Sequence, residues 1–189
     1  MLRAAVLAGG LSSRMGRDKA LLELNGITLL DRTLQLLQQC GADQVLVSGR
    51  PDHELGVPDL LPHCGPPGAV LSLLHWLEQH NQLDEAPLLL VPVDMPLLTP
   101  SVMKPLLDAA ATATGCRYER EIFPCVVPAT RELLLHLRQL FDKVQAPGGE
   151  RSMRALFDFL KCWELPIENT TRVLLANINT PEEWRGISS

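Results

Sequence analysis

The residues best suited to chemistry lie near the start of the chain, in the stretch LAGGLSSRMGRDK. Gly9 and Gly10 lack a Cβ, so the backbone can turn sharply there and bring its N–H groups close to an anion. Ser12, Arg14 and Lys19 add a hydroxyl group and two cations, which suit the oxygens of a triphosphate. The stretch matches neither a Walker A motif nor the GxGxxG dinucleotide motif. It indicates a phosphate-binding loop, and an ordinary glycine-rich turn with solvated basic side chains is the alternative.

A second candidate is Asp94, which follows the apolar run LLLVPV. A carboxylate directly after a buried strand lies at the edge of a parallel sheet where ligands bind. Mg²⁺ is usually held by one or two carboxylates together with waters and the phosphate oxygens of a substrate. Asp94 is therefore the candidate metal ligand, and an aspartate that caps a proline-rich turn is the alternative. Pro92 removes a backbone donor from this strand and predicts a bulge just before the ligand edge.

Apolar runs of two kinds position these residues. The predicted strands are RAAVLA, QVLVSG, PLLLVPVD, IFPCVV, CWEL and RVLLANI. The predicted helices are TLLDRTLQLLQQC, GAVLSLLHWLEQH, a helix that starts at Thr99–Pro100, TRELLLHLRQLF, ERSMRALFDFL and TPEEW. Thr28 is expected to cap the first long helix and Gly41 to end it. Loops are expected near residues 50–68, 112–121 and 143–150.

The alternation of strands and helices predicts the fold class. Such a pattern is typical of a mostly parallel sheet that is covered by helices on both faces. The chain has 189 residues, which is a usual length for one domain. We therefore expect a single-domain, three-layer α/β/α fold over residues 1–189.

Composition narrows the classes of partner. The formal net charge is −5, so the overall charge does not favour nucleic acid as a partner. No apolar run approaches the roughly 18 residues of a membrane span. The five cysteines are scattered and have no CxxC spacing, which argues against a disulfide framework or a zinc site. Reduced thiols and the absence of a signal-peptide pattern predict a cytoplasmic protein.

Four motifs together resemble a known family. LAGGLSSRMGRDKALLELNG, GPPGAV, PVDMPLLTP and NINTPEEW are similar, in this order, to motifs of the bacterial molybdenum cofactor guanylyltransferases, the MobA-like enzymes. The resemblance implies a Rossmann-like nucleotidyltransferase fold. It also implies transfer of GMP from Mg-GTP to the phosphate of molybdopterin, with release of pyrophosphate. The family has an asparagine near the end of its second strand, where this chain reads VSGR.

Roles for single residues follow from the same resemblance. It implies that Lys19 contacts the phosphates with Arg14 and that Asp94 binds Mg²⁺, which makes these three the catalytic set. The implied nucleotide-binding residues are Leu7, Ala8, Gly9, Gly10, Lys19, Asp59 and Asp94, with Asp59 near the guanine, and Ser12 is added to them from the chemistry of the first loop. Asn177 and Asn179 are implied on the acceptor side or near the metal. Related cytidylyltransferases tend to read LAAG at the first motif, so Gly9 favours guanine.

The implied mechanism needs few protein groups. A phosphate oxygen of the acceptor attacks the α-phosphorus in line with the departing pyrophosphate, and no general base is required because a phosphate monoester is largely ionised near neutral pH. Two alternatives stay open. One is a nucleotidyltransferase with another nucleotide or acceptor, of the cytidylyltransferase or sugar-phosphate type. The other is a non-catalytic nucleotide-binding module, against which the presence of both Lys19 and Asp94 argues.

Overall fold

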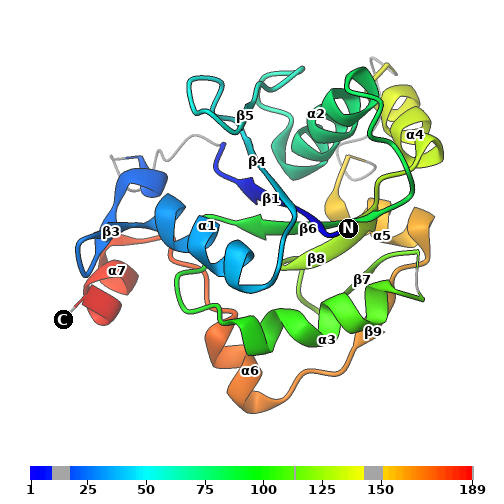
Figure 1. The fold of residues 1–189 in the computed structure, drawn as a ribbon. Helices are drawn as coiled ribbons and strands as arrows, with labels where there is room; N and C mark the ends of the chain where they lie inside the picture. The colour runs from blue at the N-terminus through cyan, green and yellow to red at the C-terminus, as the bar shows by residue number, and fades with distance from the viewer. Residues whose placement is uncertain (10–17, 113, 143–150, 189) are drawn as a thin grey trace.

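The computed structural model describes residues 1–9, 18–112, 114–142 and 151–188, and a seven-stranded sheet forms its centre (Figure 1). The strand order is β5 (Gly56–Val57), β4 (Gln44–Ser48), β1 (Arg3–Leu7), β6 (Pro87–Pro92), β8 (Cys125–Pro128), β7 (Cys116–Tyr118) and β9 (Trp163–Leu165). β1 is parallel to β4 and β6, β4 to β5, and β7 to β9. Only β8 among these strands is antiparallel to its neighbours, β6 and β7. The expected mostly parallel sheet is confirmed.

Helices cover both faces of this sheet. Successive side chains of its central strands point to opposite faces, so apolar side chains lie on both. Ala4 and Val6 of β1 face one apolar core, and Ala5 and Leu7 face a second core on the opposite side. The first core includes α1 (Leu29–Gln39) and α3 (Pro100–Ala110), and the second includes α2 (Gly65–Gln79), α4 (Arg131–Asp142) and α5 (Met153–Leu160). Figure 1 shows the two helical layers on either side of the sheet. Among the described residues, no helix has both the length and the apolar character to cross a membrane.

The remaining elements are shorter. They are the 3₁₀-helix η1 (Lys19–Leu21), the hairpin of β2 (Glu23–Leu24) and β3 (Ile27–Thr28), and the helices α6 (Asn169–Leu174) and α7 (Pro181–Ser188). The hairpin turns at Asn25 and Gly26, whose φ angles of 56° and 77° lie in the left-handed region. Asn-Gly is the strongest short sequence signal for such a turn. Sequence reasoning did not use it, so this hairpin was missed.

The predicted limits of the early helices are mostly confirmed. The Thr28 hydroxyl accepts a hydrogen bond from the Asp31 backbone N–H at 3.0 Å, which is the expected N-cap of α1. Gly41 follows α1 with a φ of 78°, as expected for a residue that ends a helix. α2 begins at Gly65, three residues earlier than predicted, because Pro66 and Pro67 fit the first turn of a helix, where N–H groups have no partner.

The predicted strand RVLLANI, residues 172–178, is wrong. Its first residues belong to α6, and the position beside β7 at this edge of the sheet is taken by β9. Leu175 and Ile178 are buried three residues apart, whereas Val173 is 65% exposed. Two of the predicted loops were also too long, since 50–68 contains β5 and the start of α2 and 112–121 contains β7. The predicted loop at 143–150 lies outside the described residues.

The predicted bulge at Pro92 is wrong as well. β1 and β6 keep one register from the pair Arg3–Leu88 to the pair Leu7–Pro92. Val93 N–H donates to the Leu7 carbonyl at 3.2 Å, so the alternate position, Pro92, turns its nitrogen to the β8 side. Pairing with β8 already ends at Leu90. Pro92 therefore replaces a donor that would have had no strand partner.

Candidate functional site

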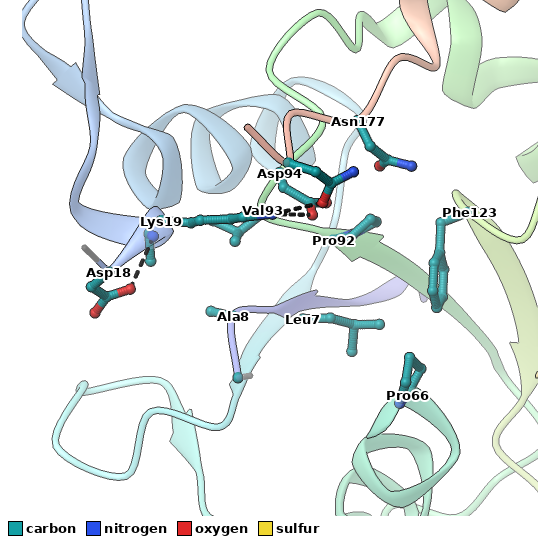
Figure 2. A pocket seen from close by; sticks show the side chains of 13 residues that line it. Leu7, Ala8, Asp18, Lys19, Pro66, Pro92, Val93, Asp94, Phe123 and Asn177 are labelled. Atoms are coloured by element: carbon teal, nitrogen blue, oxygen red, sulfur yellow. Dashed lines mark hydrogen bonds and ion pairs between the residues drawn. The ribbon is translucent and has the colours of Figure 1, made fainter. Parts of the chain in front are cut away.

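The carboxyl ends of β1 and β6 meet at one edge of the sheet, where Leu7 pairs with Pro92. Gly9 and Asp94 each lie two residues further along. A cavity of about 320 Å³ opens at this edge (Figure 2). Seven residues predicted for the site line it, namely Leu7, Ala8, Gly9, Lys19, Asp94, Asn177 and Asn179. The chain thus brings together groups that are separated by up to 172 positions in the sequence, from Leu7 to Asn179.

Lys19 and Asp94 form an ion pair across this cavity. Lys19 Nζ lies 3.1 Å from Asp94 Oδ2 and donates to Asn179 Oδ1 at 2.8 Å. The two charged side chains are 16% and 23% exposed. Figure 2 shows Lys19 reaching toward Asp94 from the side of Asp18, with Asn177 beside Asp94 and Phe123 further away on the opposite side. A positive and a negative group thus face the same space, which suits a ligand that carries phosphates and a cation.

The chemistry of the donor groups fits a magnesium ion that arrives with a nucleotide. Asp94 offers a carboxylate, and Mg²⁺ prefers one or two carboxylates plus waters and phosphate oxygens. In the described part of the chain, no group of three histidine, cysteine, aspartate or glutamate side chains could hold a metal. A protein-only metal cage is therefore not built from the described residues. Asp94 instead fits a metal that completes its coordination with substrate oxygens.

A second cavity, of about 600 Å³, adjoins the first and shares three lining residues with it: Leu7, Gly9 and Pro66. Asp59 and Ser48 also line it. The Ser48 hydroxyl is buried and has no hydrogen-bond partner. A buried hydroxyl group without a partner is costly, so it fits a polar ligand group that would complete it.

The environment of Asp59 differs from that of Asp94. Burial of the Asp59 carboxyl group raises its pKa above the usual range for aspartate, because desolvation disfavours the charged form. The Asp59 carboxylate lies 3.5 Å from the position that a Cβ on Gly9 would occupy. That is an ordinary contact distance, whereas the same Cβ would lie only 3.1 Å from Gly49 Cα, so glycine at position 9 is favoured by the neighbouring backbone rather than by Asp59. Perturbed carboxyl groups in cavities are typical of functional sites.

Two glycines bring the loops after β1 and β4 into contact between the cavities. A Cβ on Gly49 would lie 2.4 Å from Gly9 Cα, closer than real contacts allow. Gly49 also has a φ of 78°, a conformation that favours glycine. The backbones of these two loops can therefore approach each other closely beside Gly9, which lines both cavities.

Arg50 ties the two described ends of the glycine-rich segment together. Its Nε donates to the Ala8 carbonyl at 3.3 Å, and its guanidinium forms an ion pair with Asp18. This hydrogen-bonded guanidinium holds the pKa of the Asp18 carboxyl below its usual value. Asp18 in turn accepts from the Ala20 N–H at 3.1 Å and caps η1, on which Lys19 lies. The arginine therefore connects the end of β1 to the helix that carries Lys19.

Most of the predicted site residues line one of the two cavities, and the others lie outside the described residues. Asp59 lies in the second cavity, apart from the Lys19–Asp94 pair. Gly10, Ser12 and Arg14 lie outside the described residues. Sequence reasoning missed Ser48 and Arg50, although both belong to the VSGR motif, which had been noted only for its lack of asparagine.

Comparisons with known proteins agree with this arrangement. Residues 4–164 match the family model of the MobA-like NTP transferase domain. A molybdenum cofactor guanylyltransferase from Xanthomonas euvesicatoria is 37% identical over 182 residues, which cover 95% of this chain and 90% of that protein.

Solved structures of low identity share the fold. Molybdopterin-guanine dinucleotide biosynthesis protein A from Archaeoglobus fulgidus matches with a TM-score of 0.73 and 18% identity, over 98% of this chain and 96% of that one. A 2-C-methyl-D-erythritol 4-phosphate cytidylyltransferase from Thermus thermophilus matches with a TM-score of 0.65 and 19% identity, over 98% and 96%. Since proteins with different nucleotides in their names share this architecture, the fold alone does not choose the base.

Proposed function

Since this chain belongs to the MobA-like NTP transferase family, we propose that it transfers GMP from Mg-GTP to the phosphate of molybdopterin and releases pyrophosphate. The observation that carries this proposal is the pair of adjoining cavities around Gly9. One holds opposite charges suited to a metal-bound triphosphate, and the other holds polar groups suited to a base. The chain is a nucleotidyltransferase, and the identity of its nucleotide and acceptor is the proposed part.

Guanine is the base that best matches the second cavity. A carboxylate at Asp59 can accept from the N1–H and N2–H₂ groups of guanine, and neither cytosine nor adenine offers that pair of donors. Ser48 supplies a hydroxyl group that can donate or accept beside it. Asp59 must be ionised to accept both hydrogen bonds, and two donors from the base would lower the pKa that burial raises.

The first cavity supports the chemical step. In that step a phosphate oxygen of the acceptor bonds to the α-phosphorus while the bond to pyrophosphate breaks. Negative charge grows on the leaving group, and Lys19 Nζ can donate to it once the triphosphate replaces Asp94 as its partner. A magnesium ion bound at Asp94 would supply further neutralisation of that charge. Because the acceptor phosphate is already ionised near neutral pH, no side chain needs to remove a proton.

The acceptor is proposed to bind at the side of the first cavity where Asn177 lies. Asn179 accepts from Lys19 through Oδ1, which leaves its amide nitrogen as a donor for a phosphate oxygen. We assign the work of this enzyme to the cytoplasm on the basis of its five cysteines, which are all free thiols.

Thermal shift with four nucleotides tests the choice of base. With saturating Mg²⁺, GTP should raise the melting temperature more than CTP, UTP or ATP. At 100 times its Kd a ligand stabilises by about 2.7 kcal/mol, which corresponds to roughly 5–10 °C for a domain of this size. Ser48→Ala should reduce the GTP shift and leave the smaller shifts with the other nucleotides unchanged.

Pyrophosphate release with each nucleotide and molybdopterin tests the transfer itself. GTP should support turnover, and a preference for CTP in both assays would favour the cytidylyltransferase alternative. Nucleotide binding without pyrophosphate release from any pair of substrates would favour the non-catalytic module. Neither result is compatible with the proposed guanylyl transfer.

A further inference from the structure

The segment that leads into α7 is held by a reciprocal set of hydrogen bonds. The Thr180 hydroxyl accepts from the Glu183 N–H at 3.2 Å, and Glu183 Oε2 accepts from the Thr180 N–H at 3.0 Å. These two bonds form the usual capping box of a helix N-terminus. Glu183 Oε2 also accepts from the Asn179 N–H at 2.6 Å, one residue before the cap. That third bond satisfies no donor of α7 itself.

The residues held in this way contact the first cavity directly. The Asn179 side chain accepts from Lys19 Nζ at 2.8 Å, and the Ile178 backbone N–H donates to the Asp94 carbonyl at 2.8 Å. Ile178 is buried, so this part of the segment is anchored by packing. Asn179 is exposed and has no such anchor. Its backbone position between Ile178 and α7 is therefore set by the hydrogen bond from its N–H to Glu183.

We propose that Glu183 is a positioning residue, which fixes Asn179 and through it the ammonium group of Lys19. Glu183 is distant in the sequence from Lys19 and Asp94, so the glycine-rich stretch gives no sign of its role. It does not need to contact the substrate to play this role. A misplacement of about 1 Å at a catalytic group can cost roughly 100-fold in rate. The inference rests on the proposed function for its rate measurements and on the contacts alone for its spectroscopic ones.

The rate experiment compares four single variants, Asn179→Ala among them, and one double variant. Glu183→Ala should lower kcat by roughly 10-fold to 100-fold and change the KM for GTP by less than about 3-fold, because Lys19 acts on charge that develops in the reaction. Glu183→Gln keeps an acceptor oxygen and should recover most of the rate. Glu182→Ala is the matched control, since Glu182 lies in the same turn but pairs with Arg185 instead. It should behave like the parent protein.

A double-mutant cycle separates positioning from simple helix capping. If Glu183 acts through Asn179, the variant Asn179→Ala with Glu183→Ala should be as slow as Asn179→Ala alone. Additive losses in the double variant would overturn the proposal. So would a Glu183→Ala variant that melts earlier but keeps the parent kcat, because a helix cap alone has that effect.

An NMR measurement tests the same contacts without any turnover. The chain has four lysines, so ¹³C-methylated lysine signals can be assigned with Lys19→Ala. The Lys19 signal should shift in Glu183→Ala as it does in Asn179→Ala, and it should stay in place in Glu182→Ala. If the parent protein releases no pyrophosphate but this pattern holds, the proposed function fails and the positioning role stands. An unmoved Lys19 signal in Glu183→Ala overturns the positioning role whatever the activity.

Discussion

Removal of the Lys19 ammonium group should separate catalysis from stability. Its side chain is 16% exposed and lies in a cavity with Asp94 and Asn179. One preorganised donor at developing negative charge is worth about 2.7–4 kcal/mol, which corresponds to a loss of roughly 100-fold to 1,000-fold in kcat. The Lys19–Asp94 pair itself is partly solvated, so its loss should cost about 1 kcal/mol or less in stability, or at most roughly 4 °C in melting temperature.

Lys104 provides a matched control for this experiment. It also pairs with an aspartate, Asp108 at 2.8 Å, but on the outer surface of α3, where its side chain is 74% exposed. Lys104→Ala should leave kcat unchanged and shift the melting temperature by no more than about 2 °C. Pyrophosphate release and thermal melting should be measured on both variants. A Lys19→Ala variant with a kcat within 3-fold of the parent would show that the ammonium group does not act on the leaving phosphates.

Two further substitutions test the carboxylates. Asp94→Asn should bind GTP without Mg²⁺ about as well as the parent, and it should lose most of the gain in affinity that Mg²⁺ gives, because a neutral amide is a poor ligand for a hard cation. Titration calorimetry with and without Mg²⁺ measures this, and an unchanged dependence on Mg²⁺ would refute the metal assignment. At Asp59, burial raises the pKa, so the folded protein retains a proton there at pH values where the unfolded chain has lost it. The stability of the parent therefore falls as the pH rises through that window. Above the window, Asp59→Asn should melt at a higher temperature than the parent. As the pH falls into the window, GTP affinity should weaken in the parent but not in Asp59→Asn.

The position of the site could be predicted from the sequence because of the burial of two strands. β1 and β6 are apolar on both faces, so their runs of small and branched residues are readable without a partner, and polar residues directly after them must lie at the sheet edge. Gly9 and Asp94 were predicted in this way, whereas Lys19, which begins η1, was predicted from the basic residues of the glycine-rich stretch. β1 and β6 are parallel neighbours in the sheet, so their carboxyl ends lie side by side and bring these residues together.

Other parts could not be predicted because they depend on partners far away in the sequence. Ser48 could not be recognised as a site residue, because the sequence does not show that its hydroxyl group is buried without a hydrogen-bond partner. The run RVLLANI has the composition of a strand, but its first three residues end α6 and the rest is irregular, because the position beside β7 is occupied by β9. Asn179 reaches Lys19 across 160 positions, so the sequence gives no local sign of that contact.

The arrangement also separates the chemistry of the site from its choice of base. In the proposed function, Lys19 and Asp94 act on phosphates that every nucleoside triphosphate carries, and the two residues are placed by η1 and by the end of β6. Asp59 and Ser48 line the neighbouring cavity, Ser48 as the last residue of β4 and Asp59 in the loop that follows β5. A change in those loops can therefore alter the base without moving the charged pair. This proposed division is compatible with a fold that this chain shares with a cytidylyltransferase and a guanine dinucleotide biosynthesis protein at less than 20% identity. It also means that exchanges at positions 48 and 59 should redirect nucleotide preference, whereas exchanges at positions 19 and 94 should reduce turnover with every nucleotide alike.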